Sequence, residues 1–189
     1  MRVIGGQFRS RRLKTLPGEA LRPTPDRLRE ALFNVLAPEI EGAVFLDAYA
    51  GTGAVGIEAL SRGAARAIFI EADRAAIRVL RENLASLGLD AQRAEVVHAH
   101  VLKRLAAFRA DIVFLDPPYA LDREYEPAMR ILAENPPRLV IVQHHRRHEL
   151  ASHYGCLRRV RQIRQGDNAL SFYRAVAPDP HGPAVPSSG

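Results

Sequence analysis

Two short motifs hold the residues best suited to chemistry, and the first is rich in glycine. Residues 51–56, Gly-Thr-Gly-Ala-Val-Gly, follow an expected strand at residues 43–47 and precede an expected helix at residues 54–61. Loops of this pattern turn tightly and let the backbone approach a nucleotide. Glu71 ends the next expected strand, where a carboxylate accepts hydrogen bonds from ribose hydroxyls. Together with Gly51 and Gly53, it predicts a ligand that contains a nucleoside.

Asp47, at the end of the first expected strand, narrows the choice of ligand. A carboxylate at this point disfavours a pyrophosphate and suits an ammonium group. S-adenosylmethionine has a free amino acid end, a sulfonium and an adenosine, and it carries no phosphate. We therefore favour this methyl donor. A dinucleotide-dependent oxidoreductase and a tight turn without a ligand remain as alternatives.

The second motif, Asp116-Pro117-Pro118-Tyr119, follows an apolar strand-like run at residues 112–115. The two prolines stiffen the loop and lack backbone donors, so their carbonyl oxygens are left to accept. Asp116 adds a carboxylate acceptor, and Tyr119 adds a flat face for stacking. Such acceptors can orient a planar amino group so that its lone pair faces a methyl donor. The alternative is a plain turn without a functional role. The glycine loop upstream makes this alternative less favoured.

The rest of the chain predicts the elements that would position these motifs. Expected strands at residues 43–47, 66–71, 95–98, 111–116 and 139–143 alternate with expected helices at residues 54–61, 73–87, 102–108 and 124–133. This order predicts a parallel sheet covered on both faces, with both motifs at the carboxyl ends of its strands. Residues 157–163 and 170–176 predict an antiparallel hairpin at a sheet edge.

A further helix is expected near the N-terminus. Thr24 would cap it and Pro25 would open it, with Leu28 and Leu32 on its apolar face. Its arginines, Arg22, Arg27 and Arg29, are expected at its start or on its polar sides. Before this helix, residues 1–16 alternate weakly, which predicts a short strand or hairpin.

Charge is unevenly distributed along the 189 residues, whose formal net charge is +6. Residues 1–29 and 138–174 each carry +6, whereas residues 30–137 carry −5. Nearly all the basic residues are arginine, which favours a polyanion partner, although a solvated surface is the alternative. A single cysteine excludes an internal disulfide, and no apolar run approaches the ~20 residues of a membrane span. We expect a cytoplasmic monomer.

Taken together, the motifs carry a family resemblance. The sequence contains LRPTPDRLREALFNVL, FLDAYAGTGAVGIEALSRGA, IEADRAAIRVLRENL and FLDPPY in this order, and it resembles the RsmD family from Arg2 to Val176. The resemblance implies an S-adenosylmethionine-dependent enzyme that methylates N2 of a guanine in 16S rRNA, within the small ribosomal subunit. It implies an α/β Rossmann-like class I methyltransferase fold, with a seven-stranded, mostly parallel sheet and an antiparallel edge hairpin. The expected divisions are a basic extension at 1–20, the methyltransferase domain at 21–176 and a disordered tail at 177–189.

The resemblance also implies roles for individual residues. The catalytic group is Asp116, Pro117 and Tyr119, and the cofactor group is Asp47, Gly51, Gly53 and Glu71. His100 replaces the Asp or Asn that often meets the adenine amino group, and it joins the cofactor group as a candidate acceptor. The alternatives are that backbone groups meet the adenine and that His100 is a surface histidine. The expected substrate-binding residues are Arg9, Arg11, Arg12, Arg22, Thr24 and Arg27.

Other functions stay open at this point. An amino-methyltransferase for adenine or cytosine in DNA would use the same tetrapeptide chemistry, but the chain has no long target-recognition insert. Methylation of a protein glutamine is chemically similar, and a non-catalytic RNA-binding assembly factor is a different class. The cluster at residues 144–148, His-His-Arg-Arg-His, is expected to be a basic loop facing solvent or RNA rather than a metal site.

Overall fold

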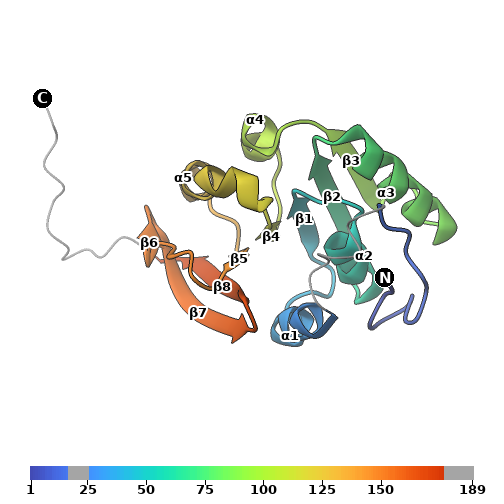
Figure 1. Cartoon of the computed structure of the whole chain (residues 1–189), viewed down its shortest axis with the longest axis horizontal. Coiled ribbons are helices and arrows are strands. Elements are labelled where there is room, and N and C mark those ends of the chain that lie inside the picture. The colour runs from blue at the N-terminus through green and yellow to red at the C-terminus, as the bar shows by residue number, and fades with distance from the viewer. Residues whose placement is uncertain (17–25, 177–189) are drawn as a thin grey trace, which may run out of the picture.

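An eight-stranded sheet forms the centre of the computed structural model, which describes residues 1–16 and 26–176 (Figure 1). The strand order is β3-β2-β1-β4-β5-β8-β7-β6. The parallel strands are β1 (Val44–Ala48), β2 (Arg66–Glu71), β3 (Ala94–His98), β4 (Ile112–Leu115) and β5 (Leu139–His145). The antiparallel ones are β6 (His153–Tyr154), β7 (Leu157–Gln165) and β8 (Asn168–Ala175).

The predicted fold class is confirmed, with one difference in the number of strands. We expected seven, and β6 is the eighth. It has two residues and pairs only with Leu157 and Arg158 of β7. A strand this short shows no alternation of apolar and polar residues, so no sequence pattern marks it.

Helices cover both faces of the sheet (Figure 1). One hydrophobic core holds α1 (Asp26–Leu36), α2 (Ala54–Ser61) and α3 (Arg74–Ser86) against the sheet. The other holds α4 (Val101–Arg104), η2 (Leu105–Ala107) and α5 (Tyr125–Glu134). A 3₁₀ helix, η3 (Tyr119–Glu124), leads from the tetrapeptide into α5. Within residues 1–16 and 26–176, the helices are too short or too polar to cross a membrane.

Helix α1 confirms the predicted apolar face but corrects the placement of one arginine. Leu28 and Leu32 are buried, as predicted. Arg29, expected on a polar side, is also fully buried. Its Nη2 donates to the carbonyl of Arg2 at 2.6 Å, and its Nε lies 3.8 Å from Glu58 of α2. Arg29 also binds Asp26, at the start of the same helix, at 3.1 Å. The buried charge therefore has partners both inside and outside the helix.

Residues 1–16, called the arm below, pack against α2 and α3. They contain a single antiparallel bridge, Arg2 to Arg12, instead of a regular hairpin. Val3, Phe8 and Leu13 belong to the core beneath α1, α2 and α3. Residues 1–16 of the extension expected at 1–20 are thus part of this core. The tail expected at 177–189 lies outside the described residues.

Backbone groups of the arm are bound by side chains of α2. The amides of Ile4 and Gly5 each donate to Glu58 at 2.8 Å, and the amide of Phe8 donates to Ser61 at 2.9 Å. Gly6 has φ +73°, and a Cβ atom there would lie 1.8 Å from the carbonyl oxygen of Ser61. The arm therefore needs glycine at this point of closest approach.

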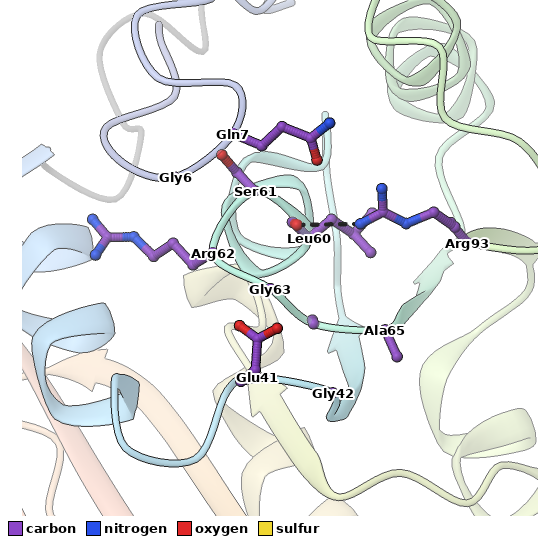
Figure 2. Close-up of a pocket in the computed structure, with 11 residues that line it drawn as sticks. Gly6, Gln7, Glu41, Gly42, Leu60, Ser61, Arg62, Gly63, Ala65 and Arg93 are labelled. Carbon is purple, nitrogen blue, oxygen red and sulfur yellow. Dashed lines mark hydrogen bonds between the residues drawn. The ribbon is translucent and has the colours of Figure 1, made fainter.

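Figure 2 shows a shallow pocket where the arm meets the end of α2, with a volume of about 610 Å³. Two arginines border it. Arg62 binds Glu58 at 2.8 Å and lies 5.3 Å from the centre of the Phe33 ring. Arg93 donates to the carbonyl of Leu60 at 3.3 Å. Both guanidinium groups bind other residues of the protein and stabilise its fold, so we place the functional site elsewhere.

Candidate active site

Both sequence motifs lie at the rim formed by the carboxyl ends of the parallel strands, around a cavity of about 800 Å³. This volume lies within the range of small-molecule and cofactor pockets. Of the predicted residues, Asp47, Gly51, Glu71, His100, Asp116 and Pro117 line it. Thr15 and Leu16 of the arm close it on one side, and Asp167 and Asn168, at the β7–β8 turn, border it on another.

The glycine loop adopts the tight turn that its sequence predicts. Gly51 and Gly53 have φ values of +55° and +88°, which favour glycine. Gly53 is not among the residues that line the cavity, and it turns the chain into α2 instead. A Cβ atom on Gly56 would lie 2.3 Å from the Phe69 ring, so this glycine lets α2 pack closely on β2.

Glu71 ties the loops after β1 and β2 together. Its carboxylate accepts from the amides of Gly51 at 2.8 Å, Ala72 at 2.7 Å and Asp73 at 2.8 Å. A carboxylate has about four lone-pair positions, so one more hydrogen bond can be accepted. The predicted ribose contact is compatible with this geometry.

The cavity is strongly acidic. Its lining includes the carboxylates of Asp47, Glu71, Asp73, Asp116, Glu124 and Asp167, and no lysine or arginine among the residues that the structure describes. Asp47 is almost fully buried and accepts from the amide of Gly56 at 2.8 Å. Burial raises the pKa of Asp47 well above its usual range, and the nearby Asp116 and Glu71 raise it further. Such a site favours a cationic ligand over a pyrophosphate.

Replacing Asp47 by asparagine is expected to stabilise the ligand-free protein and weaken cofactor binding. Since the pKa of Asp47 is raised in the folded state, its ionisation destabilises the fold as the pH rises through that value. The gain in melting temperature should therefore grow with pH and vanish below about pH 3.9. Loss of the charge should weaken S-adenosylmethionine binding by roughly 10–100-fold in calorimetry.

Asp111 provides the control for this experiment. Its carboxylate also accepts a single backbone hydrogen bond, from Val44 at 2.8 Å, but it is not among the cavity-lining residues. Asp111→Asn should leave cofactor affinity unchanged. Equal losses of affinity in the two variants would contradict a specific role for Asp47.

The tetrapeptide borders the cavity at the end of β4. Asp116 is half-buried and Pro117 is buried, whereas Pro118 is exposed. Asp116 is close enough to Asp47 to influence its pKa, so the two motifs share one electrostatic environment. Tyr119 begins η3, and its side chain lies outside the described part of the structure.

A hydrogen bond between Tyr49 and Glu124 joins the segments beside the two motifs, and the sequence interpretation missed it. The Tyr49 hydroxyl donates to Glu124 Oε2 at 2.5 Å, and both residues line the cavity. Burial and this bond raise the pKa of Tyr49, so its hydroxyl stays protonated. Tyr49 also has φ +64°, a backbone strain typical of functional sites. The two residues are 75 positions apart, so no local pattern connects them.

The prediction of a basic loop at residues 144–148 is wrong for its first two residues, which belong to a strand. β5 continues to His145, and His144 is buried beside the cavity. Burial lowers the pKa of His144, which favours the neutral ring. Its Nδ1 lies 3.0 Å from the carbonyl of His145, and its Nε2 lies 2.9 Å from the Ser171 hydroxyl. Among the described residues, no three His, Cys, Asp or Glu side chains are placed to hold a metal ion.

Asn83 of α3 is a second residue that sequence patterns did not reveal. It is buried, and its Nδ2 donates to the carbonyls of Thr52 at 3.0 Å and Lys14 at 3.1 Å. Its Oδ1 accepts from the amide of Lys14 at 2.8 Å. One side chain therefore links the arm to the glycine loop.

Replacing Asn83 by alanine is expected to weaken cofactor binding about tenfold, since the Thr52 carbonyl and the arm lose their shared partner. Hydrogen exchange should become faster at residues 13–16, which form one wall of the cavity. Ser86→Ala is the matched control, because Ser86 is on the same helix and its hydroxyl contacts only its own helix backbone, at 2.7 Å. A lower melting temperature with unchanged cofactor affinity would contradict this role.

The predicted substrate-binding residues lie outside the cavity, as far as they are described. Arg9, Arg11 and Arg12 are exposed on the arm, and Arg27 is exposed at the start of α1. Arg11 is held in place by donating to the carbonyl of Ser86 at 2.8 Å. Arg22 and Thr24 fall outside the described residues. His100 is exposed at the cavity rim, in the position that precedes α4.

Comparison with known proteins gives consistent matches. The model of the family described as "Conserved hypothetical protein 95" matches residues 1–174. "Ribosomal RNA small subunit methyltransferase D" of Escherichia coli K12 is 50% identical over 121 residues, 63% of this chain and 60% of that protein. The Haemophilus influenzae protein of the same name is 41% identical over 139 residues, 71% of this chain and 72% of that protein.

A solved structure agrees with these relatives. "Putative methyltransferase yhhF" from Escherichia coli has a TM-score of 0.80 and 36% sequence identity, and the match covers 94% of this chain and 98% of that chain. The Escherichia coli K12 sequence match covers less than two thirds of that relative, whereas the family model spans nearly all of the chain. The chain therefore belongs to the family described as "Conserved hypothetical protein 95", which is the RsmD family that its sequence resembles.

Proposed function

We propose that the protein transfers a methyl group from S-adenosylmethionine to the exocyclic N2 of a guanine in 16S rRNA of the small ribosomal subunit. The observation that carries this proposal is the acidic cavity, which brings the glycine loop and the tetrapeptide to one rim without a lysine or arginine among its described lining residues. The names of the two relatives support ribosomal RNA as the substrate.

The cavity fits S-adenosylmethionine in volume and in charge. Asp47, buried near two other carboxylates, gains a counter-charge from a ligand ammonium group. Glu71 retains an acceptor position for ribose, and His100 lies at the rim for the adenine. When bound, S-adenosylmethionine supplies an electrophilic methyl group on a positively charged sulfur.

The tetrapeptide would position the amino group that is methylated. Asp116 and the carbonyl of Pro117 accept from its two N–H groups, which turns the nitrogen lone pair toward the methyl donor. Tyr119 stacks on the base. Positioning of this kind lowers a barrier by up to ~7–11 kcal/mol in favourable cases.

An acidic cavity also determines how RNA approaches. Six carboxylates repel the phosphate backbone, so only a base that is unpaired or flipped out would enter. The exposed arginines of the arm lie outside the cavity, where phosphates would remain in solvent. An acidic cavity with arginines outside it favours nucleic acid over a protein glutamine as the substrate.

Transfer of radiolabelled methyl groups tests the proposal. Unmodified small ribosomal subunits, naked 16S rRNA and duplex DNA are each incubated with the protein and S-adenosylmethionine, followed by nucleoside analysis. N2-methylguanosine in rRNA is the expected product. Label in DNA would show that the DNA alternative is correct. Cofactor binding without label in any substrate would support the non-catalytic class.

A further inference from the structure

The outer strand of the antiparallel hairpin carries a dense row of arginines that the proposed reaction does not use. Four of the nine residues of β7 are arginine. Arg158, Arg161 and Arg164 are exposed, whereas Arg159 is partly buried and donates to the carbonyl of Leu150 at 3.2 Å. The single acidic residue between positions 157 and 175 is Asp167, which pairs with Arg146 at 3.3 Å.

A β-bulge at Val160 changes which side of the sheet these arginines face. Arg158 lies opposite Arg174, and Arg161 lies opposite Phe172. Phe172 and Arg174 are two positions apart in β8 and so share a face. In an unbroken strand, Arg158 and Arg161 would point to opposite faces. The bulge therefore places both on the α1 side, and re-aiming side chains is a recurrent role of bulges.

This arrangement does not favour stability. Arg158 and Arg174 are like charges directly opposite each other, which is destabilising in a sheet. Glu39 binds Arg174 at 2.6 Å, but no salt bridge within the described residues involves Arg158, Arg161 or Arg164. Val160, in the bulge, is 54% exposed. These features are typical of a surface that meets a partner or of a protected sheet edge.

The hairpin leads directly to the mouth of the active-site cavity. Asp167 and Asn168, at its turn, line the cavity, and the amide of Arg146 donates to the carbonyl of Asp167 at 2.8 Å. β7 thus extends from the cavity rim along one end of the sheet. Thr15 and Leu16 of the arm also line the cavity. Figure 1 shows the arm beside α3, at the opposite end of the sheet from β7.

We propose that β7, through Arg158, Arg161 and Arg164, is a second docking surface for the RNA phosphate backbone, on the opposite side of the cavity from the arm. The inference rests on the proposed function and adds a contact on the far side of the target nucleotide. Phosphates on both sides of that nucleotide would bind arginines while the base enters the acidic cavity. Arg164, opposite Ala169, faces the α5 side, so the strand offers charge on both of its faces.

Salt-dependent binding tests this surface. The probe is unmodified 16S rRNA, and the variant replaces Arg158, Arg161 and Arg164 by glutamine. Each lost phosphate contact reduces the magnitude of the slope of log K against log salt by about 0.7–0.9, so the loss of three contacts should reduce it by about 2–3. The KM for RNA should rise, and the Kd for S-adenosylmethionine should stay unchanged.

The control removes the same charge elsewhere, with glutamine at the exposed Arg66, Arg109 and Arg130, of which Arg66 and Arg130 pair with Glu95 and Glu126. None of these three lines the cavity. This control should keep the wild-type slope. Equal reductions in both variants would overturn the inference, since they would reflect net charge alone.

Light scattering at low salt, without RNA, tests the edge-protection alternative. If the β7 variant aggregates while its soluble fraction keeps the wild-type slope, the arginines only guard the sheet edge and the inference is overturned. The proposed function fails separately, when wild-type protein methylates no RNA. Methylation by the wild type together with an unchanged slope in the β7 variant would overturn this inference alone.

Discussion

Asp116→Ala is expected to lower kcat for RNA methylation about 10³-fold, because the reacting amino group loses the carboxylate that orients it. Cofactor binding should be retained, since the glycine loop, Glu71 and Asp47 keep their mutual contacts. Removing a carboxylate near Asp47 should also lower the pKa of Asp47 toward its usual range. Single-turnover methyl transfer measures the loss of catalysis, and calorimetry measures the affinity for S-adenosylmethionine.

The control is Asp122→Ala, another acid just beyond the tetrapeptide. Its side chain is 45% exposed, lies 3.8 Å from His148 and does not line the active-site cavity. This variant should have wild-type kcat. If Asp116→Ala retains kcat, or loses methylation only through a weaker cofactor affinity, the catalytic role is wrong.

Glu58→Ala is expected to lower the free energy of unfolding by about 3–5 kcal/mol, since it removes the one fully buried counter-charge of Arg29 and leaves only the half-exposed Asp26 among the described partners. It also removes the acceptor for the amides of Ile4 and Gly5. Burial already lowers the pKa of Arg29, which shows that its environment disfavours the charge. Urea denaturation measures the loss, and hydrogen exchange should show release of residues 2–13.

Glu82 offers a matched comparison, because it also binds the arm but does so in solvent. Its carboxylate lies 2.8 Å from Lys14 Nζ, with both side chains largely exposed. Exposed ion pairs contribute little to stability, so Glu82→Ala should leave the urea midpoint nearly unchanged. Similar losses in the two variants would contradict the importance of burial at Glu58.

Local patterns in the sequence predicted the elements around the glycine loop well. Helix α2 begins at Ala54 and ends at Ser61, as predicted, because Gly53 and Gly63 mark its two ends. The parallel strands are short apolar runs that lie between turn residues of this kind. Both motifs reach one rim because strand order and handedness place them there.

Residues whose environment comes from distant parts of the chain were predicted less well. The helical pattern assigns Arg29 to a polar side, but Arg2 and Glu58 take it into the core. His144 looks like part of a basic loop until Ser171, 27 positions away, contacts its ring in the sheet. Asn83 is similar, since its partners Thr52 and Lys14 lie 31 and 69 positions away. A single sequence shows none of these pairings.

The contacts of the arm also have a consequence for synthesis of the chain. Its partners in α2 and α3 lie 53 to 75 positions further along, as Gly5 with Glu58 and Arg11 with Ser86 illustrate. During translation, the arm therefore emerges from the ribosome well before the helices that bury Val3, Phe8 and Leu13. Until both α2 and α3 are complete, this arginine-rich segment lacks part of its partners, so its full docking is expected to be a late, non-local step.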